Sequence, residues 1–167
     1  MEDKEILDLL RERAVGFTEA CGIRFVEASA GRCLVSCEMG AMHRNPGGFA
    51  HGGLLAAMMD VAAGAAAIFA GGSARPITTQ NCDIHFLRPV SGPLVLAEGV
   101  CIKAGRRCAV VRVDVRENDS ARICASGTFE VCYLDTCSKK QYRLKRDCHP
   151  EERSDEGSHP SRGERAL

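Results

Sequence analysis

The sequence predicts an α+β protein in which a curved antiparallel sheet wraps around one long central helix. The first observation is an apolar, alanine-rich run over residues 52–70, which has the length of a buried helix. The second is a set of short runs, two before and four after that helix, in which apolar and polar residues alternate. This alternation is typical of antiparallel strands with one face on a core, so we expect the strands to cover the helix.

The elements before the central helix are short. Within residues 1–20, Ile6, Leu7, Leu9 and Leu10 recur at helical spacing among charged residues, which predicts an amphipathic helix. Two strands follow at 25–28 and 32–39, joined by a turn at 29–31. We expect one face of the second strand to consist of Cys33, Val35, Cys37 and Met39.

The run 52–70 is apolar on every side and ends at a pair of glycines, Gly71 and Gly72, which are typical of a helix stop. Asp60 is its only ionisable residue. A carboxylate near the middle of a membrane span costs about 2.5–3.5 kcal/mol, so a core helix is favoured over a transmembrane helix.

Four strands are expected after the helix, at 77–86, 94–103, 106–117 and 121–133. Short turns at 104–105 and 118–120 separate the last three strands. In the third of them, Val111, Val113 and Val115 alternate with more polar neighbours and define a core-facing side.

A length of 167 residues favours a single domain with short appendages. We divide the chain into an N-terminal helical segment (1–20), one folded domain (21–134) and a tail (135–167). The tail contains only six apolar side chains and a near-repeat that begins His-Pro. It cannot build a core, so we expect a disordered, low-complexity segment.

Charge and cysteine content exclude several classes of function. The chain has 22 basic and 22 acidic residues, which argues against a nucleic acid or membrane partner. Its ten cysteines include no Cys-x-x-Cys pair, so no metal site is expected. The acidic N-terminus is unlike a secretory signal and predicts a cytoplasmic protein with reduced thiols. Six cysteines within apolar runs are expected to act as small buried hydrophobes: Cys33, Cys37, Cys101, Cys108, Cys124 and Cys132.

Two features could carry chemistry. Asp60, on an otherwise apolar helix, is a candidate general base or nucleophile, unless a structural partner such as an arginine explains it. The glycine-rich stretch 45–53 leads directly into the helix, whose first-turn amides could polarise a carbonyl oxygen. The alternative is that this stretch is simply a tight turn.

These residues resemble a known family. The sequence His51-Gly52-Gly53, with Asp60 nine residues after the histidine and Asn45 six before it, resembles the hotdog-fold acyl-CoA thioesterases of the phenylacetyl-CoA thioesterase-like (PaaI-type) branch. The resemblance extends over 22–134 and includes the motifs at 83–89 and 103–106. It implies a hotdog fold, a homodimer that usually forms a homotetramer, and hydrolysis of an acyl-CoA without metal or cofactor.

The resemblance also implies individual roles. Asp60 would activate or orient water, and the Gly52 amide would polarise the thioester carbonyl. Asn45 would assist that polarisation or orient the substrate, and Thr79 would help to hold the water. His51 and Gly53 would belong to the substrate-binding start of the helix, with His51 mainly architectural.

Helix geometry adds a constraint. Gly52 and Asp60 are eight residues apart, which is about 12 Å along a helix, whereas both must act within about 3 Å of one reacting centre. We therefore expect a site shared across a two-fold interface, with Gly52 and Asn45 from one chain and Asp60 and Thr79 from the other.

The phosphates of CoA require cations. Four basic residues at strand ends or in turns are candidates, with solvated surface charge as the alternative for each: Arg88, Lys103, Arg106 and Arg107.

Two other functions are weighed against hydrolysis. One is a non-catalytic hotdog module that binds acyl-CoA, and the other is a hotdog dehydratase, whose histidine pattern is not seen. The basic run 139–146 could contact nucleic acid, but acidic residues follow it and a solvated tail is favoured. The combination of Asp60, Asn45 and the Gly52-Gly53 helix start favours hydrolysis.

Overall fold

The computed structural model describes residues 3–29, 31–71, 75–118 and 120–134, which all belong to one compact unit, Met1–Thr136. The predicted tail therefore lies outside the described residues. The helices are α1 (Asp3–Glu12), α2 (Phe17–Ala20), the short 3₁₀ helix η1 (Ala41–His43) and α3 (Gly52–Ala70). The strands are β1 (Ile23–Ser29), β2 (Arg32–Glu38), β3 (Ile77–Phe86), β4 (Leu94–Ala104), β5 (Cys108–Glu117) and β6 (Ile123–Tyr133).

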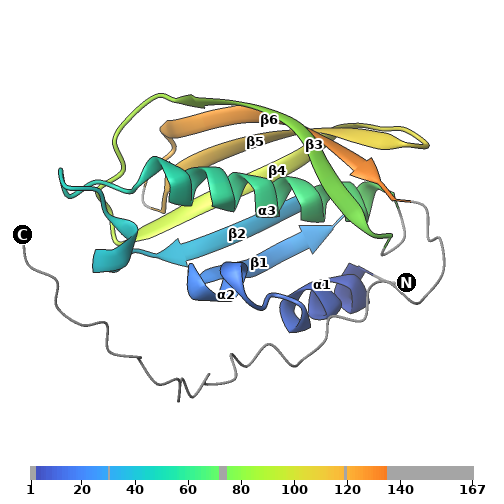
Figure 1. The fold of residues 1–167 in the computed structure, drawn as a ribbon, viewed down its shortest axis with the longest axis horizontal. Coiled ribbons are helices and arrows are strands. Elements are labelled where there is room, and N and C mark those ends of the chain that lie inside the picture. Colours follow the sequence, from blue (N-terminus) through green and yellow to red (C-terminus); the bar gives the residue numbers. More distant parts are fainter. Residues whose placement is uncertain (1–2, 30, 72–74, 119, 135–167) are drawn as a thin grey trace, which may run out of the picture. The chain divides into compact units, whose positions relative to one another are not determined.

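The six strands form one antiparallel sheet in the order β1-β2-β4-β5-β6-β3. The sheet curves around α3, which lies along its concave face (Figure 1). This arrangement confirms the predicted fold class, a hotdog fold with a long central helix.

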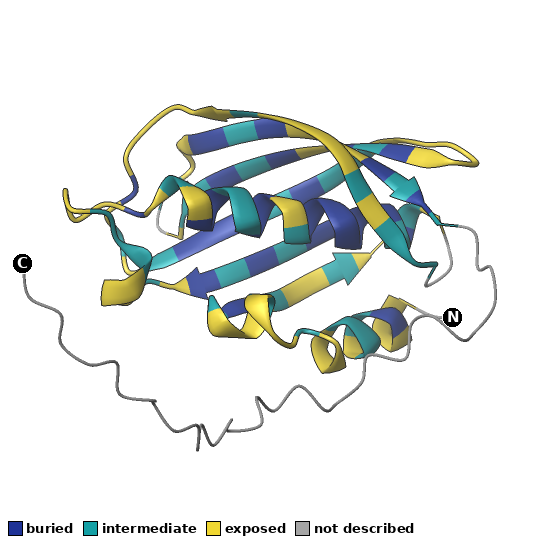
Figure 2. Ribbon diagram, viewed as in Figure 1, coloured by how far each residue is buried: buried dark blue, intermediate teal, exposed yellow. Residues whose placement is uncertain are grey.

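The core lies between α3 and the sheet, whose buried residues are dark blue in Figure 2. Met58, Met59 and Ala62 on α3 are fully buried, as are the valines of β5 that face the helix. The helix backbone packs directly on the sheet at Gly99, where an added Cβ would lie 2.7 Å from the Ala62 carbonyl oxygen. By length and composition α3 could span a membrane, but most of it is buried in this core, which accounts for its apolar character.

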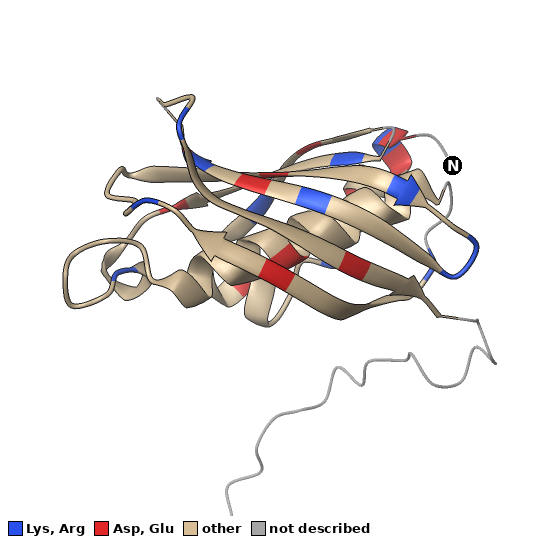
Figure 3. Cartoon of the chain, turned by 90° about the horizontal axis from the view of Figure 1, so that it is seen from above, with Lys and Arg blue, Asp and Glu red and all other residues tan. Residues whose placement is uncertain are grey.

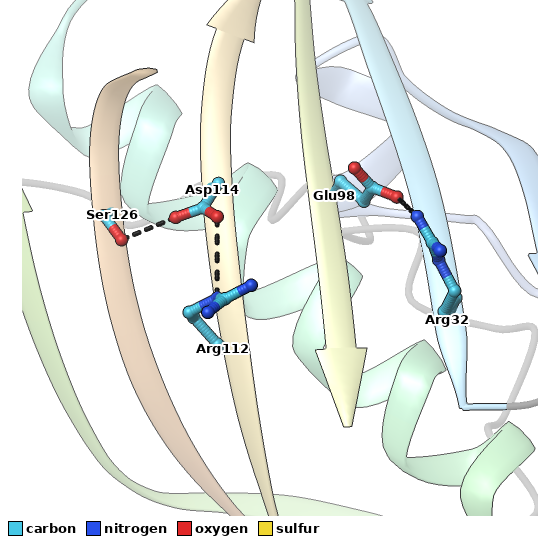
Figure 4. Close-up of polar contacts among 5 residues, drawn as sticks. All are labelled: Arg32, Glu98, Arg112, Asp114 and Ser126. Atoms are coloured by element: carbon cyan, nitrogen blue, oxygen red, sulfur yellow. Dashed lines mark hydrogen bonds and ion pairs between the residues drawn. The ribbon is translucent and has the colours of Figure 1, made fainter. Parts of the chain in front are cut away.

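The outer face of the sheet carries a group of polar side chains of both charges (Figure 4). Glu98 on β4 and Asp114 on β5 are register partners, and two like charges at such positions repel each other. Each carboxylate has its own arginine: Arg32 pairs with Glu98, and Arg112 Nε lies 3.6 Å from Asp114. Ser126 adds a hydrogen bond of 2.6 Å to Asp114, so the repulsion is offset locally.

Among the described residues, the two edge strands of the sheet, β1 and β3, differ in whether their outer backbone groups are hydrogen-bonded. Outside β1, the Arg11 side chain of α1 donates hydrogen bonds to the carbonyl oxygens of Phe25 and Val26, at 3.2 and 3.1 Å. At the other edge, β3 pairs only with β6 within the described part of the chain, and most of its residues are exposed (Figure 2). A side chain of the same chain therefore engages two carbonyl groups at the β1 edge, whereas the β3 edge is open to pairing.

Two sequence-based expectations are corrected. β5 begins at Cys108 rather than at residue 106, because the Gly105 amide bonds to the Cys108 carbonyl and closes a tight turn. Cys108 is exposed and Cys132 is only partly buried, because both lie on the outer face of the sheet. Cys101 is also only partly buried, although it packs against the core opposite Val111. Cys33, Cys37 and Cys124 are buried as expected, and burial raises the pKa of Cys33 to about 12.

Candidate active site

Asp60 lies halfway along α3, on the side that faces β3. The hydroxyl of Thr79 donates a hydrogen bond of 2.6 Å to Asp60 Oδ1, so the structure brings these two predicted residues together. The sequence predicts a core helix, but in the single chain the Asp60 side chain on that helix is exposed. Its neighbour Met59 is fully buried in the core, whereas Ala57 and Val61 are only partly buried and pack at its margin.

Asp60 and Thr79 line an open hollow of about 480 Å³. Its other walls are mostly apolar and come from α1, β1, α3 and the start of β3: Leu10, Phe25, Val61, Gly64, Ala65, Ile68, Ile77 and Thr78. The pairing of β3 with β6 shifts register between Thr79 and Asn81, so Gln80 forms a bulge beside the carboxylate. The hollow combines an ionisable group with a mostly apolar surface, as ligand-binding sites commonly do.

The start of α3 is built by His51, the N-cap residue. Its Nδ1 accepts a hydrogen bond of 2.9 Å from the Gly53 amide, so the ring proton lies on Nε2. The amide of Gly53 is thus already engaged. No described residue accepts a hydrogen bond from the Gly52 amide, which leaves it available at the positive end of the helix.

Asn45 organises the loop before the helix. Its Oδ1 accepts hydrogen bonds from the amides of Gly47 and Phe49, at 2.9 and 3.2 Å. Gly48 has a φ of 81°, a conformation that favours glycine. The side-chain oxygen of Asn45 therefore has a structural role, and its Nδ2 is the group that could bind a substrate oxygen.

The helix start faces a second hollow, of about 340 Å³, which Gly52 lines together with Asn45, Phe49, Phe86 and Arg88. This hollow and the one at Asp60 are separate, and the two have no lining residue in common. Gly52 and Asp60 are eight positions apart on one continuous α-helix. Within one chain, the structure does not bring the Gly52 amide and the Asp60 carboxylate together.

The four candidate phosphate-binding residues fall at opposite ends of β6. Arg88 lies near its start, where Nη1 donates to the Ile123 carbonyl oxygen at 2.6 Å. Lys103, Arg106 and Arg107 belong to the β4–β5 hairpin, whose loop is blue at the right-hand end of Figure 3. The Arg107 carbonyl accepts from the amide of Tyr133, the last residue of β6.

A further arginine joins that hairpin. Arg75 lies 4.9 Å over the ring of Tyr133 and donates to the Arg106 carbonyl oxygen at 3.4 Å. Together with Arg106, Arg107 and Cys132, these residues line a hollow of about 340 Å³. Arg75 is not among the residues predicted from the sequence, because it belongs to no motif and reaches the hairpin only through tertiary folding.

Comparisons with known proteins agree with this architecture. The family model described as "Thioesterase superfamily" matches residues 47–124. The structure is similar to a conserved protein of Pseudomonas aeruginosa, with 34% identity and a TM-score of 0.69 over 74% of this chain and 98% of that chain. It is also similar to a variant of the phenylacetic acid degradation protein PaaI of Thermus thermophilus, with 31% identity and a TM-score of 0.63 over 71% and 98%. The PaaI protein of E. coli shares the fold, at 18% identity and a TM-score of 0.71 over 80% and 96%.

With this fold and these relatives, the chain belongs to the thioesterase superfamily of hotdog proteins. Within that superfamily it is a PaaI-like hotdog thioesterase. In general terms, its activity is hydrolysis of a thioester.

Proposed function

We propose that this protein hydrolyses an acyl-CoA thioester to the free acid and CoA, in a site shared by two chains. Gly52 and Asn45 come from one chain, and Asp60 and Thr79 come from the other. One observation carries this proposal: the single chain holds two complementary half-sites on one helix, eight residues apart and in separate hollows. The proposed reaction uses no metal or cofactor, and we place it in the cytoplasm.

The open edge of β3 supports a two-chain arrangement. Two copies of an edge strand that pair about a two-fold axis run antiparallel, so the start of one lies beside the end of the other. Thr79, with Asp60 beside it, is near the start of β3, whereas the Phe86 ring at its end lies over Gly52. Pairing through β3 would therefore bring Asp60 of one chain toward Gly52 of its partner.

In this site, the Gly52 amide donates a hydrogen bond to the thioester carbonyl oxygen, and Asn45 Nδ2 assists. Asp60 accepts a proton from water as the water oxygen attacks the carbonyl carbon. The C–S bond then breaks, CoA leaves as a thiolate, and the proton passes from Asp60 to that sulfur. Thr79 holds Asp60 Oδ1, which leaves Oδ2 to face the water.

The same pairing would bring basic residues of two chains together. The β4–β5 hairpin lies at the end of the sheet where β3 starts, and Arg88 lies where β3 ends. Arg88 of one chain and the hairpin residues Lys103, Arg106 and Arg107 of the other would then flank one site mouth. We propose that they bind the phosphates of CoA, with His51 and Gly53 shaping the helix start below them.

Asp60→Asn tests the proposal, because asparagine retains an oxygen that can accept the Thr79 hydrogen bond but cannot act as a base. We expect hydrolysis, followed by thiol release from a panel of acyl-CoAs, to fall by about 10²–10⁴-fold with an unchanged melting temperature. A variant within threefold of the wild type would contradict the role of Asp60. Tight acyl-CoA binding by a wild-type protein that releases no thiol would instead identify a non-catalytic binding module.

The assembly can be measured separately. We expect a homodimer, and a homotetramer formed as a dimer of dimers, in light scattering coupled to size exclusion. A monomer that hydrolyses acyl-CoA at full rate would rule out the shared site.

A further inference from the structure

Cys108 and Cys132 are direct neighbours across the sheet. They are register partners on β5 and β6. The adjacent pair is hydrogen-bonded, because the Tyr133 amide donates to the Arg107 carbonyl at 2.8 Å. Cys108 and Cys132 therefore occupy a non-hydrogen-bonded pair, in which Cα atoms lie about 4.5 Å apart. A disulfide bond needs Cα atoms about 4.4–6.8 Å apart, so the backbone already meets this requirement.

Both thiols are on the outer face of the sheet. The adjacent residues Ala109 and Val131 are fully buried in the core, which turns the two cysteines to the other side. Cys108 is exposed and Cys132 is partly buried. The Sγ of Cys132 donates a hydrogen bond of 2.8 Å to Gln80 Oε1 on the neighbouring strand β3. Neither thiol belongs to the half-sites described above.

The surroundings of Cys132 indicate what kind of molecule would reach it. Cys132 lines the hollow of about 340 Å³ that also includes Arg75, Arg106, Arg107 and Tyr133. Guanidinium groups attract carboxylates and phosphates, so an anionic molecule is favoured beside this thiol.

We propose that Cys108 and Cys132 form a dithiol modification site, which a small anionic disulfide such as glutathione disulfide oxidises to a cross-strand disulfide. The Cys132 thiolate attacks one sulfur of glutathione disulfide, and one glutathione leaves as a thiolate. The Cys108 thiolate then attacks Cys132 Sγ and displaces the second glutathione. The protein loses two protons and two electrons, and one glutathione disulfide becomes two glutathione molecules.

Oxidation has a local structural consequence. Sγ of Cys132 loses its proton, and with it the hydrogen bond to Gln80. Gln80 is the bulge residue that follows Thr79, so the modification acts on the strand that carries one half-site. The dithiol site does not depend on the proposed hydrolysis. Its disulfide can be detected by mass spectrometry without any activity measurement.

The experiment treats the full-length protein with excess glutathione disulfide, alkylates the remaining thiols and maps the peptides without reduction. We expect a linkage between Cys108 and Cys132 that dithiothreitol reverses. In Cys108→Ser, the reaction should stop once one glutathione is attached to Cys132. Cys132→Ser should abolish the linkage. Cys82→Ser is the matched control, because Cys82 is exposed but pairs with Phe129, and it should leave the linkage intact.

Two results would overturn the proposal. One is that Cys108 and Cys132 both remain open to alkylation when Cys82 has reacted. The other is that wild-type protein carries stable glutathione on either cysteine with no linkage between them.

The arginine-lined hollow has its own test. Arg106→Ala should slow oxidation by glutathione disulfide by about tenfold, and should leave the rate with neutral hydroxyethyl disulfide unchanged. An equal effect on both reagents would show that charge does not recruit the oxidant.

Discussion

Glu117 shows how single side chains hold the loops around the helix start. Its Oε1 accepts hydrogen bonds from the amides of Ser91 and Gly92, at 2.6 and 2.7 Å. Arg44 then donates to the carbonyl oxygens of Gly48 and Ser91, which ties the loop of Asn45 to the same point. A carboxylate at the end of β5 therefore fixes a loop that lines the Gly52 hollow.

The charge of Glu117 gives a pH-dependent prediction. The Gly92 amide, and then the Ser91 amide, hold the pKa of Glu117 below its ordinary value of 4.5. A lowered folded-state pKa gives stability that is present above the unfolded-state pKa and is lost as the pH falls through the folded-state pKa. We expect Glu117→Gln to lower the free energy of unfolding at pH 7 by about 1 kcal/mol, after allowing for solvent screening, and to have a smaller effect near pH 3.5.

Urea unfolding at both pH values checks this expectation, with Glu130→Gln, an exposed carboxylate on β6, as the control. If Glu117→Gln lowered the free energy of unfolding equally at pH 7 and pH 3.5, the shape of the Glu117 side chain rather than its charge would explain its contribution to stability.

Among the elements, the contact between α3 and β4 sets the distance of the helix from the sheet. An alanine Cβ at Gly99 would lie 2.7 Å from the Ala62 carbonyl oxygen, and helix backbone cannot move aside as a side chain can. We expect Gly99→Ala to destabilise the protein by about 1–3 kcal/mol, measured by urea unfolding.

Gly40→Ala is a matched control for the loss of a glycine. The nearest atom to its added Cβ is His43 Nδ1, at 3.7 Å, which is an ordinary contact. Its effect should stay within about 0.5 kcal/mol. Equal effects of the two substitutions would contradict the close packing at Gly99.

Elements with strong local signals could be predicted from the sequence. α3 and β3 have the predicted bounds, because glycines and a proline mark their ends and their composition is uniform. The start of β5 could not be predicted, because Arg106 and Arg107 fit a strand or a turn equally well. The exposure of Asp60 was missed for a different reason. Apolar residues surround it on the helix, and the sequence does not show which of them face the core and which face an open edge.

At the scale of the whole molecule, the shared site predicts that two inactive variants complement each other. Gly52→Pro removes the amide at the first position of the helix, where proline is well tolerated. The extended backbone of His51, with φ −65° and ψ 133°, also suits a residue before proline. Asp60→Asn removes the base from the other half-site.

Equal amounts of the two variants, refolded together, pair at random, so half of the dimers are mixed. Each mixed dimer contains one site with neither substitution and one site with both. We therefore expect about a quarter of the wild-type activity per chain, whereas each variant alone stays near its own baseline. Activity that remains at the baseline after confirmed mixing would mean that each chain holds its own complete site.

The hydrogen bonds of Arg11 to the outer carbonyl groups of β1 limit how this protein can associate through its sheet. Growth of a fibre by strand addition requires two free edges on every molecule, one to join and one to be joined. Here Arg11 already occupies two carbonyl groups at the β1 edge, so β3 is the edge that remains open to pairing in the described part of the chain. When two copies pair through β3, the open edge of each copy is occupied, so association by this route ends at two copies.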